Sequence, residues 1–217
     1  MHNKPRQAVL IYAAAAALAA AVAIGVAVPA SAGPREQTMA RPIYIAVGEV
    51  TRPPIGWVEF CDERPWECRV EASEPRDVEL TKAVAKELER VNRFVNDRIK
   101  PMTDLEHYGV VEKWTYPEDG YGDCEDYVLL KRRMLMQLGW PREALLITVV
   151  RDKKGDGHAV LTVRTDKGEL ILDNQVSEIL PWHDTGYRYV KRQSQADPNL
   201  WVALGDPRQT PVVAAPR

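Results

Sequence analysis

The spacing of apolar residues predicts two amphipathic helices in the middle of the chain. The first begins near residues 74–77, ends before Pro101, and repeats its apolar side chains every three or four positions: Val84, Leu88, Val91, Val95 and Ile99. The second runs from about Cys124 to Leu138 and is ended by Gly139 and Pro141. The stripe of the first helix is expected to form part of the core, and the second helix has Tyr127, Leu130, Met134 and Leu138 on one face.

Past residue 144 the pattern changes to short runs rich in β-branched residues, separated by turn residues. Strands are expected at 145–150, 158–165, 169–173 and 187–190. Helices followed by an antiparallel meander predict an α+β domain, with N-terminal helices packed on an antiparallel β-sheet. The remaining segments are expected to be irregular: a long ordered loop at 41–70, a surface loop at 107–122, and irregular chain after about 194.

The N-terminal segment has the pattern of an export signal. Residues 1–7 contain Lys4 and Arg6 and no acid, and residues 8–28 are apolar and rich in alanine. An A-x-A site at 30–32 then predicts a signal peptide of residues 1–32, cleaved after Ala32. The alternative is an uncleaved membrane anchor, because the apolar run is long enough to span a bilayer. Either reading places the domain outside the cytoplasm.

The organisation expected after the signal is a flexible leader at 33–40 and one domain at 41–217, with a loose tail from Pro211. These 185 residues suffice for a single core. They carry 27 Lys and Arg against 31 Asp and Glu, a net charge of −4. This balance argues against a nucleic-acid partner, and no second apolar run implies membrane insertion after signal cleavage.

The three cysteines divide into a pair and a single residue. Cys61 and Cys68 lie in CDERPWEC, and in an oxidising compartment they are expected to form a local disulfide. A zinc site is the alternative, although no histidine or second cysteine pair lies nearby. Cys124 is left over, either as a structural thiol or as a nucleophile.

Cys124 stands among acids in the stretch GDCEDY, residues 122–127. Negative neighbours disfavour a thiolate, whereas the first turn of a helix favours one. Therefore either Cys124 is inert or something offsets the charge of the surrounding carboxylates.

A histidine and an acid on neighbouring strands are candidates to act with this thiol. A four-residue loop between the second and third expected strands pairs Arg164 with Glu169. In that register His158 becomes the diagonal neighbour of Asp173, within reach of an imidazole nitrogen. Taken singly, each of the three has an ordinary structural explanation, as a core thiol, a strand-edge histidine and a turn aspartate. Together, in this order, they predict a Cys-His-Asp triad.

The sequence resembles the bacterial transglutaminase-like cysteine proteinases of the LapG type. The residues that carry the resemblance are W-x-x-F-C at 57–61 with Cys68, Trp114, YGDCEDY at 121–127, GHAVLTVRT at 157–165 and LDNQ at 172–175. The resemblance implies a papain-like transglutaminase fold and the triad Cys124, His158 and Asp173. It also implies dependence on calcium through Asp123 and Glu125. It further implies a periplasmic protease that cuts the N-terminal region of a large surface adhesin in biofilm control, restrained by an inner-membrane receptor of cyclic di-GMP.

Two other functions remain open from the sequence. The same triad serves a thiol acyltransferase, a transglutaminase or an amidase, and an inert Cys124 would leave a non-catalytic calcium-binding interaction module. In the protease reading, the Cys124 backbone N–H supplies one oxyanion donor, and the loop with Trp114 and Tyr116 supplies the other. Asp123 has its own alternative, as the N-cap of the second helix.

Overall fold

The computed structural model describes residues 43–69 and 72–205. The signal peptide (1–32), the leader (33–40) and the loose tail (211–217) lie outside the described residues and stay predictions. Within the described ranges, no helix has both the length and the apolar character needed to cross a membrane.

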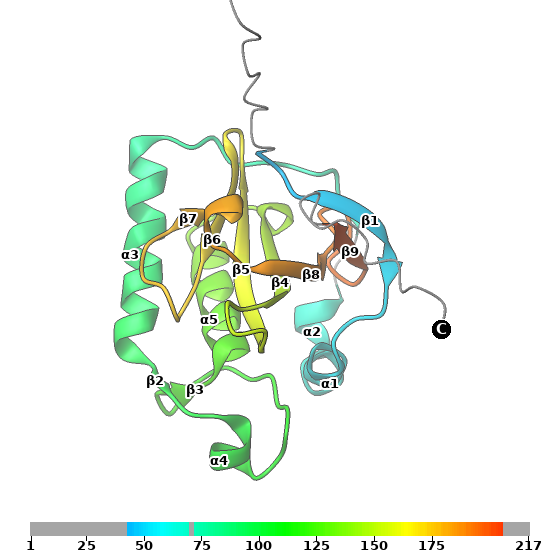
Figure 1. Ribbon diagram of the computed structural model, residues 1–217, viewed down its shortest axis with the longest axis vertical. Coiled ribbons are helices and arrows are strands. Elements are labelled where there is room, and N and C mark those ends of the chain that lie inside the picture. Colours follow the sequence, from blue (N-terminus) through cyan, green and yellow to red (C-terminus); the bar gives the residue numbers. More distant parts are fainter. Residues whose placement is uncertain (1–42, 70–71, 206–217) are drawn as a thin grey trace, which may run out of the picture. The chain divides into compact units, whose positions relative to one another are not determined.

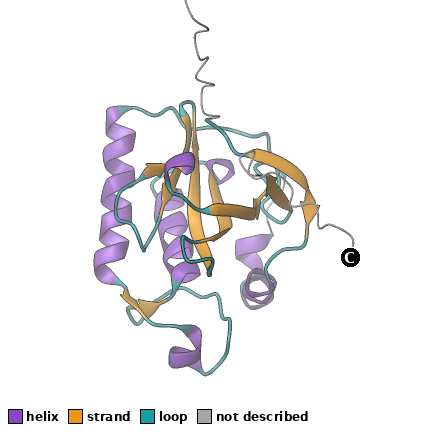
Figure 2. Cartoon of the chain, in the orientation of Figure 1, coloured by secondary structure: helices purple, strands orange, loops and turns teal. Residues whose placement is uncertain are grey.

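The described part of the chain is built on an antiparallel sheet of seven strands, with helices packed against it (Figures 1 and 2). The strand order is β1-β9-β8-β4-β5-β6-β7. These strands are β1 Ala46–Thr51, β4 Leu145–Arg151, β5 Gly157–Thr165, β6 Gly168–Leu172, β7 Leu180–Pro181, β8 Arg188–Gln193 and β9 Trp201–Gly205. A short parallel pair, β2 Lys100–Pro101 and β3 Tyr121–Gly122, forms a separate sheet. The α+β prediction is confirmed.

The helices precede most of the sheet in sequence, as expected. They are α1 Ile55–Glu63, α2 Pro65–Cys68, α3 Lys82–Arg98, α4 Asp104–Tyr108 and α5 Cys124–Gln137, with 3-10 turns η1 Arg142–Ala144 and η2 Trp182–Asp184. α3 begins at Lys82 rather than near 74–77, because Thr81 caps it by accepting a hydrogen bond from the Val84 N–H. Its stripe is confirmed, since Leu88, Val91 and Val95 are buried.

The hairpin of β5 and β6 has the predicted register, with Arg164 opposite Glu169. The turn depends on Gly168, whose φ of +116° suits glycine alone. A Cβ there would also lie 2.7 Å from the backbone oxygen of Ile43. Register and turn together fix which side chains of β5 face those of β6.

The sheet is covered on both faces. One face packs against α1, α3 and α5 through the largest apolar cluster, which includes Trp57, Leu88, Leu135, Leu161 and Trp201. The other face carries a second cluster that includes Ile45, Val160, Ile171, Trp182 and Tyr187. Since β5 is buried on both sides, residues at its start are held firmly in place.

Three expectations about loops were wrong, one of them in part. Residues 41–70 contain β1, α1 and α2, and Trp57 and Phe60 of α1 stack in the core instead of lying in a loop. The stretch 107–122 is a surface loop only in part: residues 109–112 are exposed, but Trp114 and Tyr116 are buried against α1. The chain after 194 forms β9, which joins β1 to the sheet. Each segment owes its structure to partners distant in sequence, which short-range patterns do not reveal.

Cys61 of α1 and Cys68 of α2 form a disulfide, as the spacing of the cysteines predicts. The bond closes the turn between two short helices whose own capping is weak, since neither has a side-chain cap.

Candidate active site

Cys124 is the first residue of α5, and its side chain packs against the start of β5. The Sγ atom accepts a hydrogen bond from the Ala159 N–H at 3.3 Å and donates one to Glu125 Oε2 at 3.1 Å. Burial, followed by the charge of Glu125 and its hydrogen bond, raises the pKa of the thiol well above its ordinary value. The start of α5 does not overcome these effects, so the thiol is protonated in this arrangement.

His158 and Asp173 form a buried pair beside this cysteine. His158 Nε2 lies 2.8 Å from Asp173 Oδ1, and each side chain is only 2% exposed. The confirmed register brings them together, because β5 and β6 place both side chains on the same face of the sheet. Burial alone would raise the pKa of Asp173, but hydrogen bonds from His158 and Tyr187 hold it below its usual value. Asp173 is therefore an anion suited to orient an imidazole.

The two halves of the predicted triad adjoin each other through Ala159, the residue after His158. The thiol proton points to Glu125, and the free imidazole nitrogen, Nδ1, lies 3.4 Å from the Gln175 amide nitrogen. Proton transfer from Cys124 to His158 therefore requires Sγ to release Glu125. The arrangement links the reactivity of the thiol to the state of that carboxylate.

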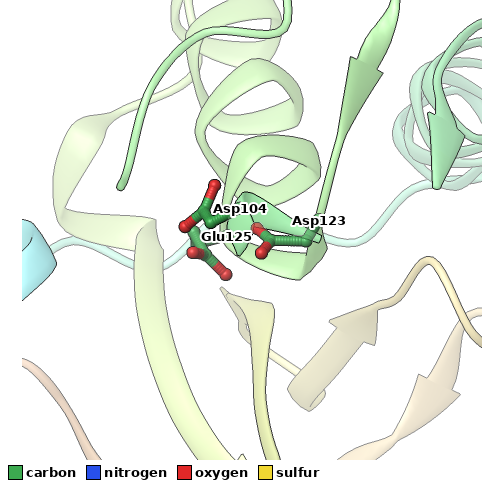
Figure 3. A group of neighbouring side chains, drawn as sticks. All are labelled: Asp104, Asp123 and Glu125. Atoms are coloured by element: carbon green, nitrogen blue, oxygen red, sulfur yellow. The ribbon is translucent and has the colours of Figure 1, made fainter. Parts of the chain in front are cut away.

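Three carboxylates gather at the entrance to α5, those of Asp104, Asp123 and Glu125 (Figure 3). One oxygen from each lies within 4.8 Å of the others. Asp123 Oδ1 and Glu125 Oε1 are buried and have no hydrogen-bond partner in the described part of the chain. Burial and the neighbouring Asp123 charge raise the pKa of Glu125 to about 9, and burial raises the pKa of Asp123 and of Asp104. Hard carboxylate oxygens that lie close together, with little positive charge nearby to balance them, fit a calcium ion.

The cap alternative for Asp123 is wrong. Asp123 is the N-cap residue of α5 by position, but its side chain makes no capping hydrogen bond. Its carboxylate turns toward Glu125 and Asp104 instead (Figure 3).

The sequence pattern did not identify Asp104 as a residue of this carboxylate cluster. It is the first residue of α4 and is 2% exposed. The capping box formed by Thr103 and Glu106 explains an acid at that place as part of a helix start. The β2–β3 pair brings α4 to the start of α5, and strands of two residues leave no sequence signal.

Asp126 holds the loop that was expected to supply an oxyanion donor. Its Oδ1 accepts the Thr115 N–H at 2.8 Å, and burial raises its pKa to about 8. Gly122 has to be glycine here, since a Cβ would lie 2.7 Å from Asp126 Oδ2. The Lys113 N–H is likewise taken, by Asp104. Hence neither Thr115 nor Lys113 has a backbone N–H available for an oxyanion.

The first residue of a helix is a cysteine that packs on a strand whose histidine is paired with a carboxylate from the neighbouring strand's end. Within a mixed fold of helices and an antiparallel sheet, this arrangement defines a cysteine proteinase of the transglutaminase-like class. The chain belongs to the bacterial transglutaminase-like cysteine proteinases (BTLCP), because the model of that family matches residues 47–209.

Solved structures of LapG from Legionella pneumophila are similar to the chain. One is 31% identical to this chain, with a TM-score of 0.47, and the match covers 55% of this chain and 69% of the LapG chain. A calcium-bound form is 29% identical, with a TM-score of 0.48, and the match covers 57% of this chain and 72% of that LapG chain. A comparison with curated proteins finds no match.

Proposed function

We propose that the protein is a calcium-dependent cysteine endopeptidase with Cys124 as nucleophile, His158 as general base and Asp173 as the residue that orients it. The observation that carries the proposal is the position of Cys124, at the start of a buried helix and against the strand residue that follows His158. A structural thiol would not need a buried imidazole–carboxylate pair beside it.

The proposed cycle uses the two imidazole nitrogens separately. Nε2 is held by Asp173, so Nδ1 takes the thiol proton. The thiolate attacks a peptide carbonyl, and the Cys124 N–H donates to the developing oxyanion. The imidazolium then protonates the leaving amine. In the second half, His158 removes a proton from water, and the hydroxide releases the acyl group as a carboxylic acid.

Asp104, Asp123 and Glu125 would hold the calcium ion, which when bound supplies positive charge beside the thiol. As a ligand of that ion, Glu125 would no longer accept the hydrogen bond from the Cys124 thiol, and Sγ would be free to turn toward His158. With the ion bound, Asp123 and Glu125 would also fix the loop that enters α5, and with it the position of the sulfur. Without the ion, the carboxylates around Cys124 disfavour the thiolate. With the ion bound, the same site would favour it.

The substrate and location follow from the family resemblance. We place the protein in the periplasm, after cleavage of the signal, and propose the N-terminal region of a large surface adhesin as its substrate. An inner-membrane receptor of cyclic di-GMP is the proposed partner that restrains it. Incubating the purified protein with N-terminal fragments of the cell's large surface proteins, then sequencing the products, tests this assignment.

Replacing the proposed triad residues tests the chemistry. Cys124→Ala and His158→Ala should each abolish cleavage, and Asp173→Asn should be less severe, because it alters tautomer and orientation rather than removing a reactant. Product analysis by mass spectrometry and circular dichroism of each variant check this. Retained cleavage in Cys124→Ala would exclude the thiol mechanism.

Calcium should raise both activity and stability. A ligand that binds only the folded state stabilises it by about 2.7 kcal/mol at a hundredfold excess over its Kd, so the Tm should rise on adding calcium. Asp104→Asn and Glu125→Gln should lose this rise, and chelation should stop cleavage until calcium returns. Glu118→Gln, an exposed acid, is the control. An unchanged Tm in the parent protein would contradict the assignment.

A further inference from the structure

Tyr187 contacts both members of the histidine–carboxylate pair. It follows η2 and precedes β8, and it is 3% exposed. Its hydroxyl donates to Asp173 Oδ2 at 2.5 Å. Its ring meets the His158 imidazole edge to face, with centroids 5.8 Å apart and an interplanar angle of 83°.

The two oxygens of Asp173 have separate tasks. Oδ1 lies against His158 Nε2 and also accepts the Gln175 N–H at 2.9 Å. Oδ2 is bonded to Tyr187. A buried carboxylate oxygen without a donor is costly, and a carboxylate free to rotate would not keep Oδ1 aimed at the imidazole. The tyrosine hydroxyl therefore sets the plane of the carboxylate.

Solvent cannot easily replace that hydroxyl. The cavity beside Asp173 and Tyr187 has a volume of about 10 Å³, and apolar Ile171 and Leu180 help to line it. This is room for one water at most.

The turn that carries Tyr187 is itself fixed. Gly186 has a φ of +74°, and the Tyr187 N–H donates to Thr185 Oγ1 at 3.3 Å. Thr185 Oγ1 in turn donates to the Trp182 carbonyl at 2.8 Å. The phenol therefore reaches Asp173 from a turn that is held by its own hydrogen bonds.

We propose that Tyr187 is a positioning residue of the active site, which acts on His158 through Asp173; this rests on the function proposed above. Removing the hydroxyl should lower kcat about 10- to 100-fold, the usual effect of a hydrogen bond to a charged group, and leave KM within about twofold. It should also destabilise the ionised form of Asp173. The carboxylate would then be protonated at higher pH, so the acid limb of the kcat/KM profile should move to higher pH.

Other titratable groups face this pair and are kept constant in the comparison. Lys131 of α5 acts on Asp173, while Asp152 and Tyr189 act on Tyr187. The difference between parent and variant therefore reports on the Tyr187 hydroxyl.

The experiment compares Tyr187→Phe with Tyr44→Phe in the presence of calcium. Tyr44 is the control, a half-buried tyrosine whose hydroxyl donates to the Thr165 carbonyl at 2.9 Å, at the end of β5 away from His158. Two readouts are taken against pH: kcat/KM for cleavage, and the rate at which iodoacetamide alkylates Cys124. Tyr187→Phe should move the acid limb of both to higher pH, and Tyr44→Phe should move neither.

A 3-fluorotyrosine at position 187 keeps the shape and makes the phenol a stronger donor, so it should move the acid limb to lower pH even if Tyr187→Phe folds poorly. Unmoved profiles in the fluorotyrosine protein, or equal profiles for the two Phe variants, would overturn the proposal. If the parent protein cleaves no protein but the alkylation profiles move as expected, the positioning role stands and the protease assignment fails.

Discussion

Glu169 is a buried carboxylate shared by two arginines. It is 1% exposed, and its Oε1 accepts from Arg164 at 2.9 Å and from Arg192 at 2.6 Å. Its Oε2 accepts the Ile45 N–H at 3.0 Å. One side chain thus joins β6, β5, β8 and the segment before β1.

Glu169→Ala should destabilise the protein strongly. Arg192 is 2% exposed and would remain charged and buried without its partner, a change that typically costs about 3–5 kcal/mol. Arg164 would keep its pairing with Asp77. Urea unfolding measures the difference, with Glu118→Ala as an exposed control. A loss below about 1 kcal/mol would show that the arginines find other partners.

The disulfide between Cys61 and Cys68 holds the helices α1 and α2 together. Closing so short a loop should stabilise the protein by about 2–3 kcal/mol, mainly through the unfolded chain. The double variant Cys61→Ser and Cys68→Ser should lower the urea midpoint accordingly and leave the m-value nearly unchanged. Free thiols at both positions in exported protein, detected by mass spectrometry, would contradict the bridge.

The sequence predicts those elements whose partners are close along the chain. The β5–β6 register followed from one charge pair, Arg164 and Glu169, with four residues of turn between them. β1 could not be predicted, because five of its six residues are exposed, so it has no alternating pattern, and its partner is β9. For the same reason, the sequence did not show that Asp104 lies beside the acids near Cys124, or that Tyr187 contacts Asp173.

The buried side chain of Lys131 makes the stability of the whole protein depend on pH in an unusual way. It is fully buried on α5, and its Nζ has no hydrogen-bond partner among the described residues. Burial lowers its pKa to about 7, with the Asp173 charge acting in the opposite direction.

Below about pH 7 the ammonium is charged in both the folded and unfolded states, so its burial destabilises the fold. Between about pH 7 and 10.5 only the unfolded state holds the proton, so this penalty fades as the pH rises. Lys131→Met should therefore stabilise the protein by a few kcal/mol at pH 6 and much less at pH 10. Lys154→Met, an exposed control, should give no such slope. Equal effects at both pH values in urea unfolding would show that folding does not lower the pKa of Lys131.

The pairing of β1 with β9 bears on the order in which the chain can fold. Ala46 and Gly205 are partners although they are 159 positions apart. During synthesis the first strand to emerge has no partner until the last strand has been made, whereas the β4–β5–β6 hairpins can close at once. Since β1 is also the outermost strand, we expect the sheet to be completed from its centre outward and its N-terminal edge to close last. A ribosome-bound chain cut short before residue 201 would hold the Cys124, His158 and Asp173 segments yet leave β1 exposed as an unpaired, aggregation-prone strand.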